Sequence, residues 1–490
     1  MKKYFLFNLL LINHLLIAQS IPAFPTAEGF GAMTITGGRG GKVIFVTNLN
    51  CSGAGSLNEA LKTPGFKYIL FKVSGVIDCA AEVVEGDCYI AGQTSPGGII
   101  VRNLIFDSWY HPERHPNNVI VRHLSSRPSE NAVRPATGWL DGDALRLDGV
   151  KNVILDHCNF THATDENVQI SRSRNIIIQN SLLAEGMGEH FERSGMLLNY
   201  SVTDKRQDSI SIHHNMWNRI GGRMPEISGE RSAERPDDKD CLINPLNIEL
   251  SYNLFWDIPT HVGFNSGFDP AEPERADYGL NANMIGNYAV GRASYNGGMF
   301  HNHFLDVYKN NLYVNDNRME RFPQYTDYQL FTCCNDFAEE GNHPNKQMGT
   351  AVLLKEPYPF PAITRTASDS LKWYMTRQVG AFNAFSSDRR DPLTRRLLSF
   401  VSAGKPDSNL VDGTDYYKDV FKMDYTTPPP YPLDTDGDGM PDEWEIKYGL
   451  DHTIPDHNGM ILSIRLTGYS TYSNLECYLN QLADDLVKNR

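Results

Sequence analysis

One short pattern recurs between residues 118 and 287 and limits the folds that this chain can adopt. Each copy opens with Asn or Ser, continues through residues in which apolar side chains alternate, and ends in a polar turn that often holds Asn. The copies begin at Asn118, Asn152, Asn175, Ser209, Asn247 and Asn281. A unit this short cannot bury an apolar face alone, so the units must stack on one another to share a core.

The stretch from residue 66 to about residue 315 is rich in Val, Ile and Asn and has few windows of helical periodicity. Such segments predict short strands, and their stacking predicts an all-β fold, a parallel β-helix. Leucine-rich and propeller repeats are disfavoured because neither signature is present. The Asn residues that close the strands are expected to form a ladder of side-chain hydrogen bonds along the axis. The candidates for this ladder are Asn180, Asn215, Asn253 and Asn287.

The segment ahead of the repeat is expected to close one end of the stack. Residues 42–49 alternate as a strand, and residues 56–61 predict a short helix that covers an edge otherwise free to pair with other chains. The chain has eight cysteines, which suits an oxidising compartment. Cys79 and Cys88 flank a turn-like stretch and are the expected local disulfide.

Residues 1–20 have the features of a secretory signal peptide. Lys2 and Lys3 precede an apolar run that ends at Ala18, and Ala18 and Ser20 place small residues where a signal peptidase cleaves. The run is shorter than the roughly 20 apolar residues that span a membrane, and no other segment qualifies. We therefore expect a secreted protein, extracellular or periplasmic, with no membrane segment after cleavage.

The formal net charge of −14 makes nucleic acid an unfavourable partner. An anionic ligand of any other kind would also be repelled at long range. Its binding would require a local cationic patch or a bridging metal ion.

The C-terminal part of the chain contains a calcium-loop motif. After the Pro-rich run at residues 428–432, the sequence matches the EF-hand pattern D-x-D-x-D-G-x5-E, with Gly439 at the sharp turn. The candidate ligands are Asp434, Asp436, Asp438, Asp442 and Glu445. Residues 428–490 are therefore predicted to form a linker and a small calcium module. Residues 316–427 lose the repeat and are expected to pack as irregular and helical structure on a β-helix that covers residues 21–315.

Three charged clusters fall on successive units of the repeat. The first contains Asp141 and Asp143, the second Asp165 and Glu166, and the third Arg223. Neighbouring turns of a parallel stack lie ~4.8 Å apart, so Asp143 and Asp165 can meet on one face. Because grouped carboxylates repel one another unless a cation joins them, and because hard oxygen ligands favour calcium, this face is a predicted calcium site.

Other polar residues near these clusters are expected to be structural. Asp156 and His157 end a strand and are predicted to hydrogen-bond neighbouring turns. His213 and His214 have no partners that complete a metal triad, so stacking in a turn is expected of them.

The residues around the clusters resemble the pectate lyases of polysaccharide lyase family one, in particular the secreted Bacteroidetes type. The most specific combination is Val-Ile-Leu-Asp-His-Cys at 153–158, Asp-Glu-Asn at 165–167, His-His-Asn at 213–215 and Arg-Met-Pro at 223–225. The resemblance implies a right-handed parallel β-helix that cleaves α-1,4-linked galacturonan by β-elimination. It also implies one Ca²⁺ at the lyase site, in addition to the ion expected in the C-terminal loop.

The resemblance assigns roles to individual residues. By position, Arg223 aligns with the arginine that removes the C5 proton of the sugar. Asp143 and Asp165 align with calcium ligands, and Asp141 and Glu166 are additional ligand candidates. Candidate substrate contacts are His190, Arg193 and Arg219. The expected partner is polygalacturonate, bound by a monomer.

Three positions depart from the family pattern. Gln169 stands where a third calcium carboxylate is common, Met187 where a substrate-binding lysine is expected, and Ser228 where a second arginine is expected. These departures leave two alternatives open. One is a pectin lyase or another β-helix enzyme that degrades pectin, and the other is a non-catalytic β-helix that binds wall polysaccharide.

Overall fold

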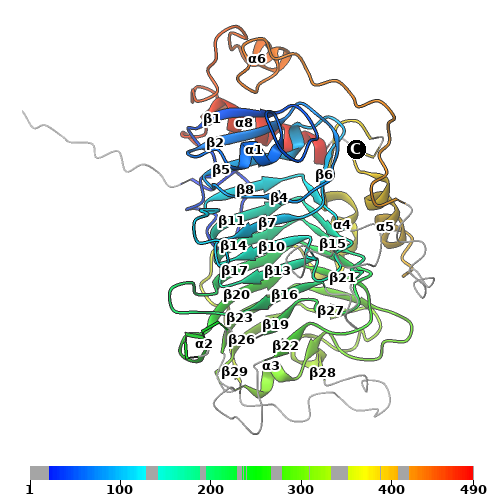
Figure 1. The fold of residues 1–490 in the computed structure, drawn as a ribbon. Helices are drawn as coiled ribbons and strands as arrows, with labels where there is room; N and C mark the ends of the chain where they lie inside the picture. The colour runs from blue at the N-terminus through cyan, green and yellow to red at the C-terminus, as the bar shows by residue number, and fades with distance from the viewer. Residues whose placement is uncertain are drawn as a thin grey trace, which may run out of the picture.

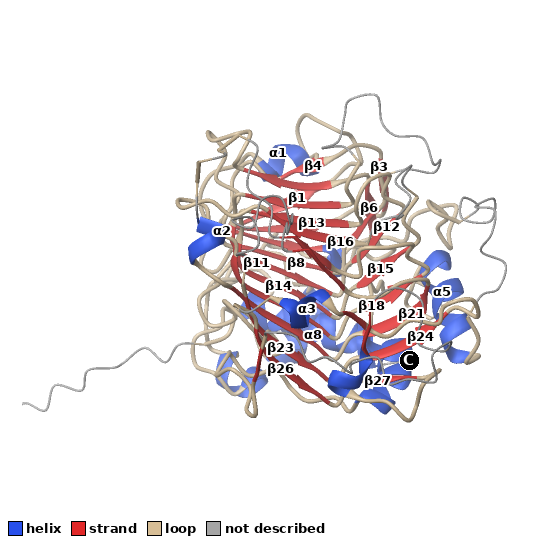
Figure 2. Ribbon diagram, turned by 90° about the horizontal axis from the view of Figure 1, so that it is seen from below, coloured by secondary structure: helices blue, strands red, loops and turns tan. Residues whose placement is uncertain are grey.

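A computed structural model describes residues 21–128, 142–187, 195–228, 234–235, 237–238, 240–265, 279–307, 309–332, 351–386, 388–406 and 419–488. Its strands pair in parallel and stack into long sheets (Figure 1), so the predicted all-β parallel β-helix is confirmed. Sheets of 11, seven and nine strands form the walls, and a two-stranded sheet lies near one end. Figure 2, seen from below, shows strands of successive turns lying side by side.

Each sheet takes one strand from nearly every turn of the solenoid. The 11-stranded sheet contains β1 (Lys42–Val46), β2 (Lys67–Phe71), β5 (Cys88–Ala91), β8 (Val119–Arg122), β11 (Lys151–Asp156), β14 (Arg174–Gln179), β17 (Asp208–His213), β20 (Leu246–Ser251), β23 (Leu280–Ile285), β26 (Asn311–Asn315) and β29 (Val352–Leu353). The seven-stranded sheet contains β4 (Ala81–Glu82), β7 (Leu104–Asp107), β10 (Leu145–Asp148), β13 (Val168–Ser171), β16 (Met196–Asn199), β19 (Glu226–Ser228) and β22 (Gly263–Asn265).

The nine-stranded sheet closes the coil. It contains β3 (Gly75–Ile77), β6 (Ile99–Val101), β9 (Ser125–Ser126), β12 (Asn159–Thr161), β15 (Leu182–Ala184), β18 (Met216–Asn218), β21 (Leu254–Ile258), β24 (Tyr288–Gly291) and β27 (Arg318–Met319). The two-stranded sheet pairs β25 (Phe300–His301) with β28 (Phe331–Thr332). Strand pairing thus continues past residue 315.

The core is built from columns of apolar side chains that run along the axis. One column in the 11-stranded sheet joins directly paired, buried residues on nine turns: Ile69, Ile90, Val121, Leu155, Ile178, Ile212, Leu250, Met284 and Val314. The alternation seen in the sequence places these residues inside, because successive side chains of a strand point to opposite faces. The repeat therefore encodes the core directly.

An asparagine ladder follows the strands of the 11-stranded sheet. The Oδ1 atoms of Asn253, Asn287 and Asn317 each accept a hydrogen bond from the backbone N–H of the Asn one turn earlier, at 3.0, 3.0 and 3.1 Å. The Asn215 side chain donates to the Ile178 carbonyl at 2.7 Å. Buried backbone groups in the turns are thereby satisfied.

Asn180 was predicted to belong to this ladder, and that prediction is wrong. Ser181 takes the ladder position, since its backbone N–H donates to Asn215 Oδ1 at 2.8 Å. Asn180 instead occupies the preceding turn residue, where φ is +51°, and its Oδ1 accepts from the Tyr374 hydroxyl at 2.7 Å. Asparagine tolerates this left-handed conformation better than most residues, which accounts for its presence there.

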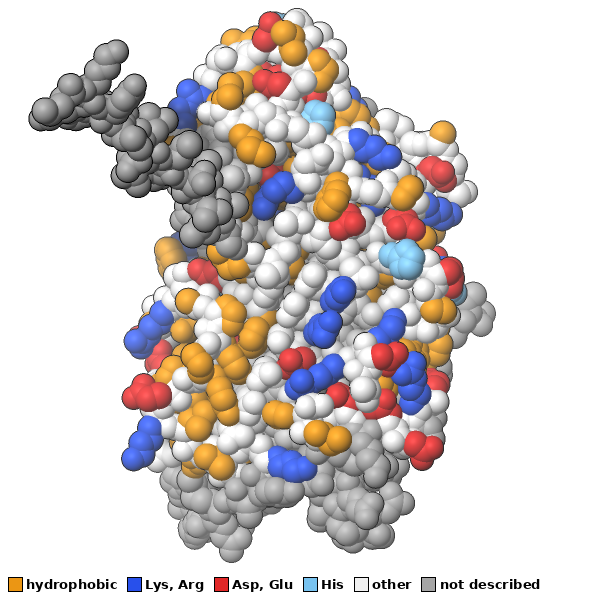
Figure 3. Space-filling model, turned by 90° about the vertical axis from the view of Figure 1, so that its left-hand side faces the viewer, with side chains coloured by type: hydrophobic (Ala, Val, Ile, Leu, Met, Phe, Trp, Pro, Cys, Tyr) orange, Lys and Arg blue, Asp and Glu red, His pale blue; other side chains and the backbone are white. Residues whose placement is uncertain are grey.

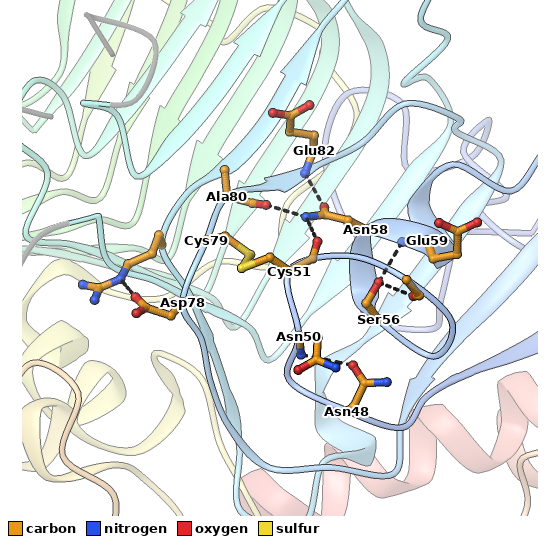
Figure 4. Close-up of a disulfide and its surroundings, with 12 residues drawn as sticks. Asn48, Asn50, Cys51, Ser56, Asn58, Glu59, Asp78, Cys79, Ala80 and Glu82 are labelled. Carbon is orange, nitrogen blue, oxygen red and sulfur yellow. Dashed lines mark hydrogen bonds and ion pairs between the residues drawn. A yellow bond between two sulfur atoms is a disulfide. The ribbon is translucent and has the colours of Figure 1, made fainter. Parts of the chain in front are cut away.

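The N-terminal end of the solenoid is closed as the sequence suggested. The predicted helix appears as α1 (Leu57–Leu61), and the Ser56 hydroxyl caps it by accepting from the Glu59 N–H. Leu57 and Leu61 join the interior core. The predicted Cys79–Cys88 disulfide is wrong, because Cys79 pairs with Cys51 across a Cα–Cα distance of 5.8 Å (Figure 4). Cys88 is a free thiol buried in the core, where a strand residue facing inward cannot reach the surface turn.

Replacing both Cys51 and Cys79 with alanine is expected to lower the free energy of unfolding by about 3 kcal/mol. The bond closes a segment of 28 residues, and its loss frees the unfolded chain over that length. Denaturant unfolding of the double variant against the oxidised wild type checks this. An unchanged free energy of unfolding would contradict it.

Helices cover two outer surfaces of the solenoid. The described chain has α1 and the helices α2 (Asp240–Ile243), α3 (His303–Asp306), α4 (Leu371–Gln378), α5 (Pro392–Ser402), α6 (Asp442–Tyr448), α7 (Ser463–Thr467) and α8 (Asn474–Lys488), with 3₁₀ turns η1 (Gly92–Thr94), η4 (Asp327–Leu330) and η5 (Ser368–Ser370). Helices α4 and α5 pack on the nine-stranded sheet, where Leu371 and Leu397 meet Met216 and Trp256. No helix among the described residues is long and apolar enough to cross a membrane.

The C-terminal helix returns to the N-terminal end of the solenoid. Figure 1 shows α8 beside β1 and β2. Leu475 and Leu479 of α8 share a buried cluster with Tyr68 and Leu70, the outward-facing residues of β2. This cover explains why β2 is buried on both faces.

Candidate active site

Three carboxylates meet at one edge of the seven-stranded sheet. Asp143 lies just before β10, and Asp165 and Glu166 lie just before β13, which pairs with β10 in register. One carboxylate oxygen from each residue lies within 4.8 Å of the others. All three side chains are buried. The structure thus brings together the predicted ligands Asp143, Asp165 and Glu166, while Asp141 lies outside the described residues.

Burial and mutual repulsion make this cluster electrostatically costly. Burial, with the charges of Glu166 and Asp165, raises the pKa of Asp143 well above its usual value, and the nearby Arg146 opposes the shift. Asp143 accepts hydrogen bonds from the Glu166 backbone N–H at 3.1 Å and from Arg146 Nη1 at 3.3 Å. Three carboxylates at this spacing fit a divalent cation that takes oxygen ligands.

Arg223 completes the cluster from a third turn. It lies between β18 and β19, and its guanidinium pairs with the Glu166 carboxylate. Its backbone is fixed, because its carbonyl accepts from the Met196 N–H at 2.7 Å, and its φ is +51°. The Arg223 side chain is 20% exposed while that of Glu166 is 3% exposed, so Arg223 is the member that faces the outside.

Arg146 is a member of the site that sequence reasoning missed. Its Nη1 donates to Gln169 Oε1 at 2.5 Å, and its Nη2 contacts Asp148 Oδ2 at 2.9 Å. Arg146 and Asp148 alternate with buried leucines in β10, which places both on the outer face beside the carboxylates. The alternation was the signal that could have identified Arg146. Gln169, the departure from the family pattern, thus contacts a guanidinium.

Of the three predicted substrate contacts, the structure describes Arg219. Arg219 is buried, and its Nη1 pairs with Glu185 Oε1 at 3.0 Å. Arg396 of α5 pairs with the same carboxylate at 2.7 Å. Arg219 therefore joins the solenoid to α5. His190 and Arg193 lie outside the described residues.

Asp156 and His157 occupy the structural positions predicted for them. Arg122 Nε contacts Asp156 Oδ2 at 2.7 Å, and Gln179 of the next turn donates to Asp156 Oδ1 at 2.8 Å. Burial alone would raise the pKa of Asp156, but His157 and Arg122 hold it well below its usual value. The carboxylate thus stays ionised and joins neighbouring turns.

The two neighbouring histidines are also packed in the wall. His213 Nδ1 lies 3.0 Å from His214 Nδ1, and His214 Nε2 lies 2.9 Å from the Thr366 hydroxyl. Burial lowers the pKa of both. Both side chains thus have partners within the wall, in agreement with the turn-stacking role expected of them.

A second acidic cluster lies in the C-terminal loop. Asp434, Asp436 and Asp438 form one group of oxygens within 4.8 Å, and Asp438, Glu445 and Asp456 form another. Glu445 is fully buried, yet neither of its carboxylate oxygens has a hydrogen-bond partner among the residues that the structure covers. Burial and the surrounding carboxylates, Asp438 first, raise the pKa of Glu445 to about 8. Oxygens of this kind are suited to a bound cation.

Two members of this loop differ from the sequence prediction. Asp442 lies outside both groups, because its carboxylate accepts from the Thr435 N–H at 2.7 Å and the Thr435 hydroxyl at 2.6 Å. The sequence prediction did not include Asp456, because this residue lies beyond the twelve-residue motif and comes close to it only in the folded chain. Its backbone N–H donates to Asp438 Oδ2 at 2.9 Å.

Several known proteins are similar to this chain in sequence or in structure. No protein-family model matches the chain. A solved pectate lyase from Bacillus sp. N165, in complex with trigalacturonate, is 14% identical and covers 72% of this chain and 98% of its own, with a TM-score of 0.43. The probable pectate lyase C of Aspergillus flavus is 28% identical over 472 residues, which cover 95% of this chain and 94% of that protein. The probable pectate lyase C of Aspergillus fumigatus is 30% identical over 471 residues, 94% of each chain. This chain belongs to the pectate lyase family.

Proposed function

We propose that this chain cleaves α-1,4-linked galacturonan by β-elimination, and that it does so at the cluster of Asp143, Asp165, Glu166 and Arg223. The observation that carries the proposal is the meeting of three buried carboxylates and one guanidinium from three different turns of the solenoid. The curated relatives named pectate lyases, which match over nearly the whole chain, support the same substrate.

The reaction needs a base and a means of stabilising negative charge. Loss of the C5 proton leaves an electron pair that forms the C4–C5 double bond as the C4–O bond breaks, and the departing oxygen takes up a proton. The C5 proton is acidic because the uronate carboxylate is its neighbour, and charge develops on that group. Calcium bound at the cluster would neutralise the uronate carboxylate.

The residues of the cluster divide these tasks. Asp143, Asp165 and Glu166 would hold the metal ion. Arg223, partly exposed above them, is assigned the removal of the C5 proton. That role requires a neutral guanidine, and therefore a pKa well below the value above 12 that arginine has in water.

A second candidate function is suggested by Arg146. Its guanidinium contacts Asp143 and Gln169, and so places a fixed positive charge among the ligand positions. A fixed cation can stabilise a developing carboxylate or ester charge without a metal ion. A pectin lyase that acts on methylated polymer and does not need calcium is the function that this contact favours.

Asp143→Asn is expected to lower the turnover of polygalacturonate by about 100-fold or more, because the variant removes one ligand charge from the cluster. The rate is measured by the near-ultraviolet absorbance of the unsaturated product, with calcium and with chelator. Asp78→Asn, at an exposed carboxylate near the disulfide, is the matched control and is expected to behave as wild type. Activity that survives chelator and prefers methylated pectin would support the second candidate and contradict the first.

We also propose that the C-terminal loop binds calcium through Asp434, Asp436, Asp438, Glu445 and Asp456. The buried oxygens of Glu445, which have no hydrogen-bond partner in the described parts of the chain, support this. The N-terminal sequence supports export through removal of residues 1–20, and we propose that the enzyme acts outside the cytoplasm, in the periplasm or the medium, and as a monomer.

A further inference from the structure

We propose that a basic groove on the solenoid, separate from the carboxylate cluster, is a second binding site for anionic polysaccharide. The groove has a volume of about 300 Å³ and is lined by the six cations Arg114, Lys151, Arg172, Arg174, Lys205 and Arg206. The identity of the polymer, a polyuronate, rests on the proposed function. The existence of the groove does not.

The groove is a product of the repeat. Four successive connections from the seven-stranded sheet to the 11-stranded sheet contribute cations: Arg114 lies between β7 and β8, Lys151 begins β11, Arg174 begins β14, and Lys205 and Arg206 precede β17. Lys151 and Arg174 are direct partners in the strand register. Because successive turns lie ~4.8 Å apart, the cations form a row along the axis. Figure 3 shows Lys and Arg side chains gathered at mid-height on this side of the molecule.

The charge of the groove opposes that of the whole chain. The protein carries a formal charge of −14, yet Asp204 is the one carboxylate among the described residues that line the groove. Lys151 and Arg174 are exposed, and neither side chain forms an ion pair or hydrogen bond with another described residue. Arg206 Nη2 donates to the Pro245 carbonyl at 2.7 Å, whereas its Nε has no hydrogen-bond partner within the described part of the chain. A row of like charges of this kind favours a polyanion over scattered counter-ions.

The floor of the groove is rigid, whereas its rim is open. Arg172 is buried, its Nε and Nη2 contact the Asp148 carboxylate at 2.8 and 2.7 Å, and its guanidinium stacks 4.2 Å from the Trp109 ring centroid. Lys205 Nζ donates to the Ser108 carbonyl at 2.5 Å and the Ser108 hydroxyl at 2.8 Å. These two cations are therefore held in place before a ligand arrives, which lowers the cost of ordering on binding.

The groove lies at the opposite end of β10 from the carboxylate cluster. Asp143 precedes the strand and Gly149 follows it, so at about 3.3 Å per residue the two sites are roughly 20 Å apart. A chain held in the groove leaves the cluster free. Holding one segment of a long polymer there raises the effective concentration of its other segments at the cluster.

The lining favours a polyuronate over nucleic acid. A polyuronate carries one carboxylate on each sugar, a periodic charge that suits one cation on each turn. Single-stranded nucleic acid binders stack bases on aromatic side chains, but the described lining of this groove contains no Phe, Tyr or Trp. The described lining also contains no Leu, Ile, Phe or Trp, the large apolar side chains that would insert into a membrane.

The test is the double variant Lys151→Gln with Arg174→Gln in the full-length protein. Its affinity for polygalacturonate is measured by affinity electrophoresis in chelator, so that binding is separated from turnover. We expect the Kd to rise about tenfold and the slope of log K against log salt to fall by about one to two. The ratio of polymer kcat/KM to trigalacturonate kcat/KM is expected to fall about fivefold.

The matched control is Lys42→Gln with Lys62→Gln, which removes the same charge from exposed lysines outside the groove. It is expected to retain wild-type affinity. An unchanged Kd in the Lys151 and Arg174 variant, or tighter wild-type binding to single-stranded DNA than to polygalacturonate, would overturn the inference. If the wild type shows no lyase activity but its binding still depends on this pair, the proposed lyase function is contradicted, whereas the proposed binding role of the groove is supported.

Discussion

Arg223→Ala is expected to lower the turnover of polygalacturonate by about 10³-fold, within the range that a positioned proton-transfer group contributes. Arg223 is the partly exposed member of the cluster, and its guanidinium pairs with Glu166. Alanine keeps the backbone contacts that fix this position, including the hydrogen bond from Met196. Turnover is followed through the unsaturated product, and folding through thermal unfolding.

A second variant separates the roles that Arg223 can have. Arg223→Lys keeps a positive charge beside Glu166 but loses the planar fork, so a purely electrostatic role predicts a small loss and a role as base predicts a shifted pH profile of kcat. Arg377→Ala, at a residue of α4 that packs on Trp373, is the matched control. Full activity of Arg223→Ala with native unfolding would rule out the proposed mechanism.

Much of the fold could be predicted because the apolar alternation within each copy of the repeat determines how the strands stack. Alternating apolar residues in each copy fix which side chains face inward, and equal register then makes Asp143 and Asp165 neighbours. The predicted ladder was wrong by one residue at Asn180, because asparagine is suited both to a turn position with positive φ and to a ladder position. The structure distinguishes them through the partner of Ser181.

Contacts that depend on the path of the chain could not be predicted in the same way. Arg219 lies four residues from Arg223, yet the turn directs it to Glu185 and α5. The role of Arg146 becomes visible only in the folded chain, where Asp143 from its own turn and Gln169 from the next turn contact its guanidinium. Cys51 meets Cys79 only because the first turns of the solenoid fold around α1. In each case the sequence gives the residue type and folding supplies its partner.

Calcium is expected to raise the melting temperature of this protein through the C-terminal loop, and Glu445→Gln is expected to abolish most of that increase. At a free concentration 100 times the Kd, binding to the native state alone stabilises by about 2.7 kcal/mol. The buried Glu445 carboxylate lies near Asp438 and Asp456 and has no hydrogen-bond partner among the described residues, so a bound cation would relieve the repulsion between these carboxylates.

The effect should reach the solenoid because the loop is docked on it. A side chain at Gly439 would lie 2.5 Å from Leu70 of β2, which shows how closely the loop backbone approaches the sheet. His457 Nε2 lies 3.2 Å from the Gly41 carbonyl, and Asn458 donates to the same oxygen at 3.0 Å. Loosening of the loop would therefore weaken the cover over the first strands.

The experiment uses the Asp143→Asn background, so that calcium at the carboxylate cluster does not contribute to the shift. Thermal unfolding with calcium and with chelator is compared for this variant, for its Glu445→Gln derivative and for its Asp456→Asn derivative. Glu443→Gln is the matched control, since Glu443 lies two residues before Glu445 on the exposed face of α6. This variant should retain the full shift. A calcium shift that is equally large with and without Glu445 would mean that the loop is not the stabilising metal site. If the shift is lost in the Glu445→Gln derivative but kept in the Asp456→Asn derivative, the site is restricted to the residues of the motif. Asp456 would then lie near the ion without binding it.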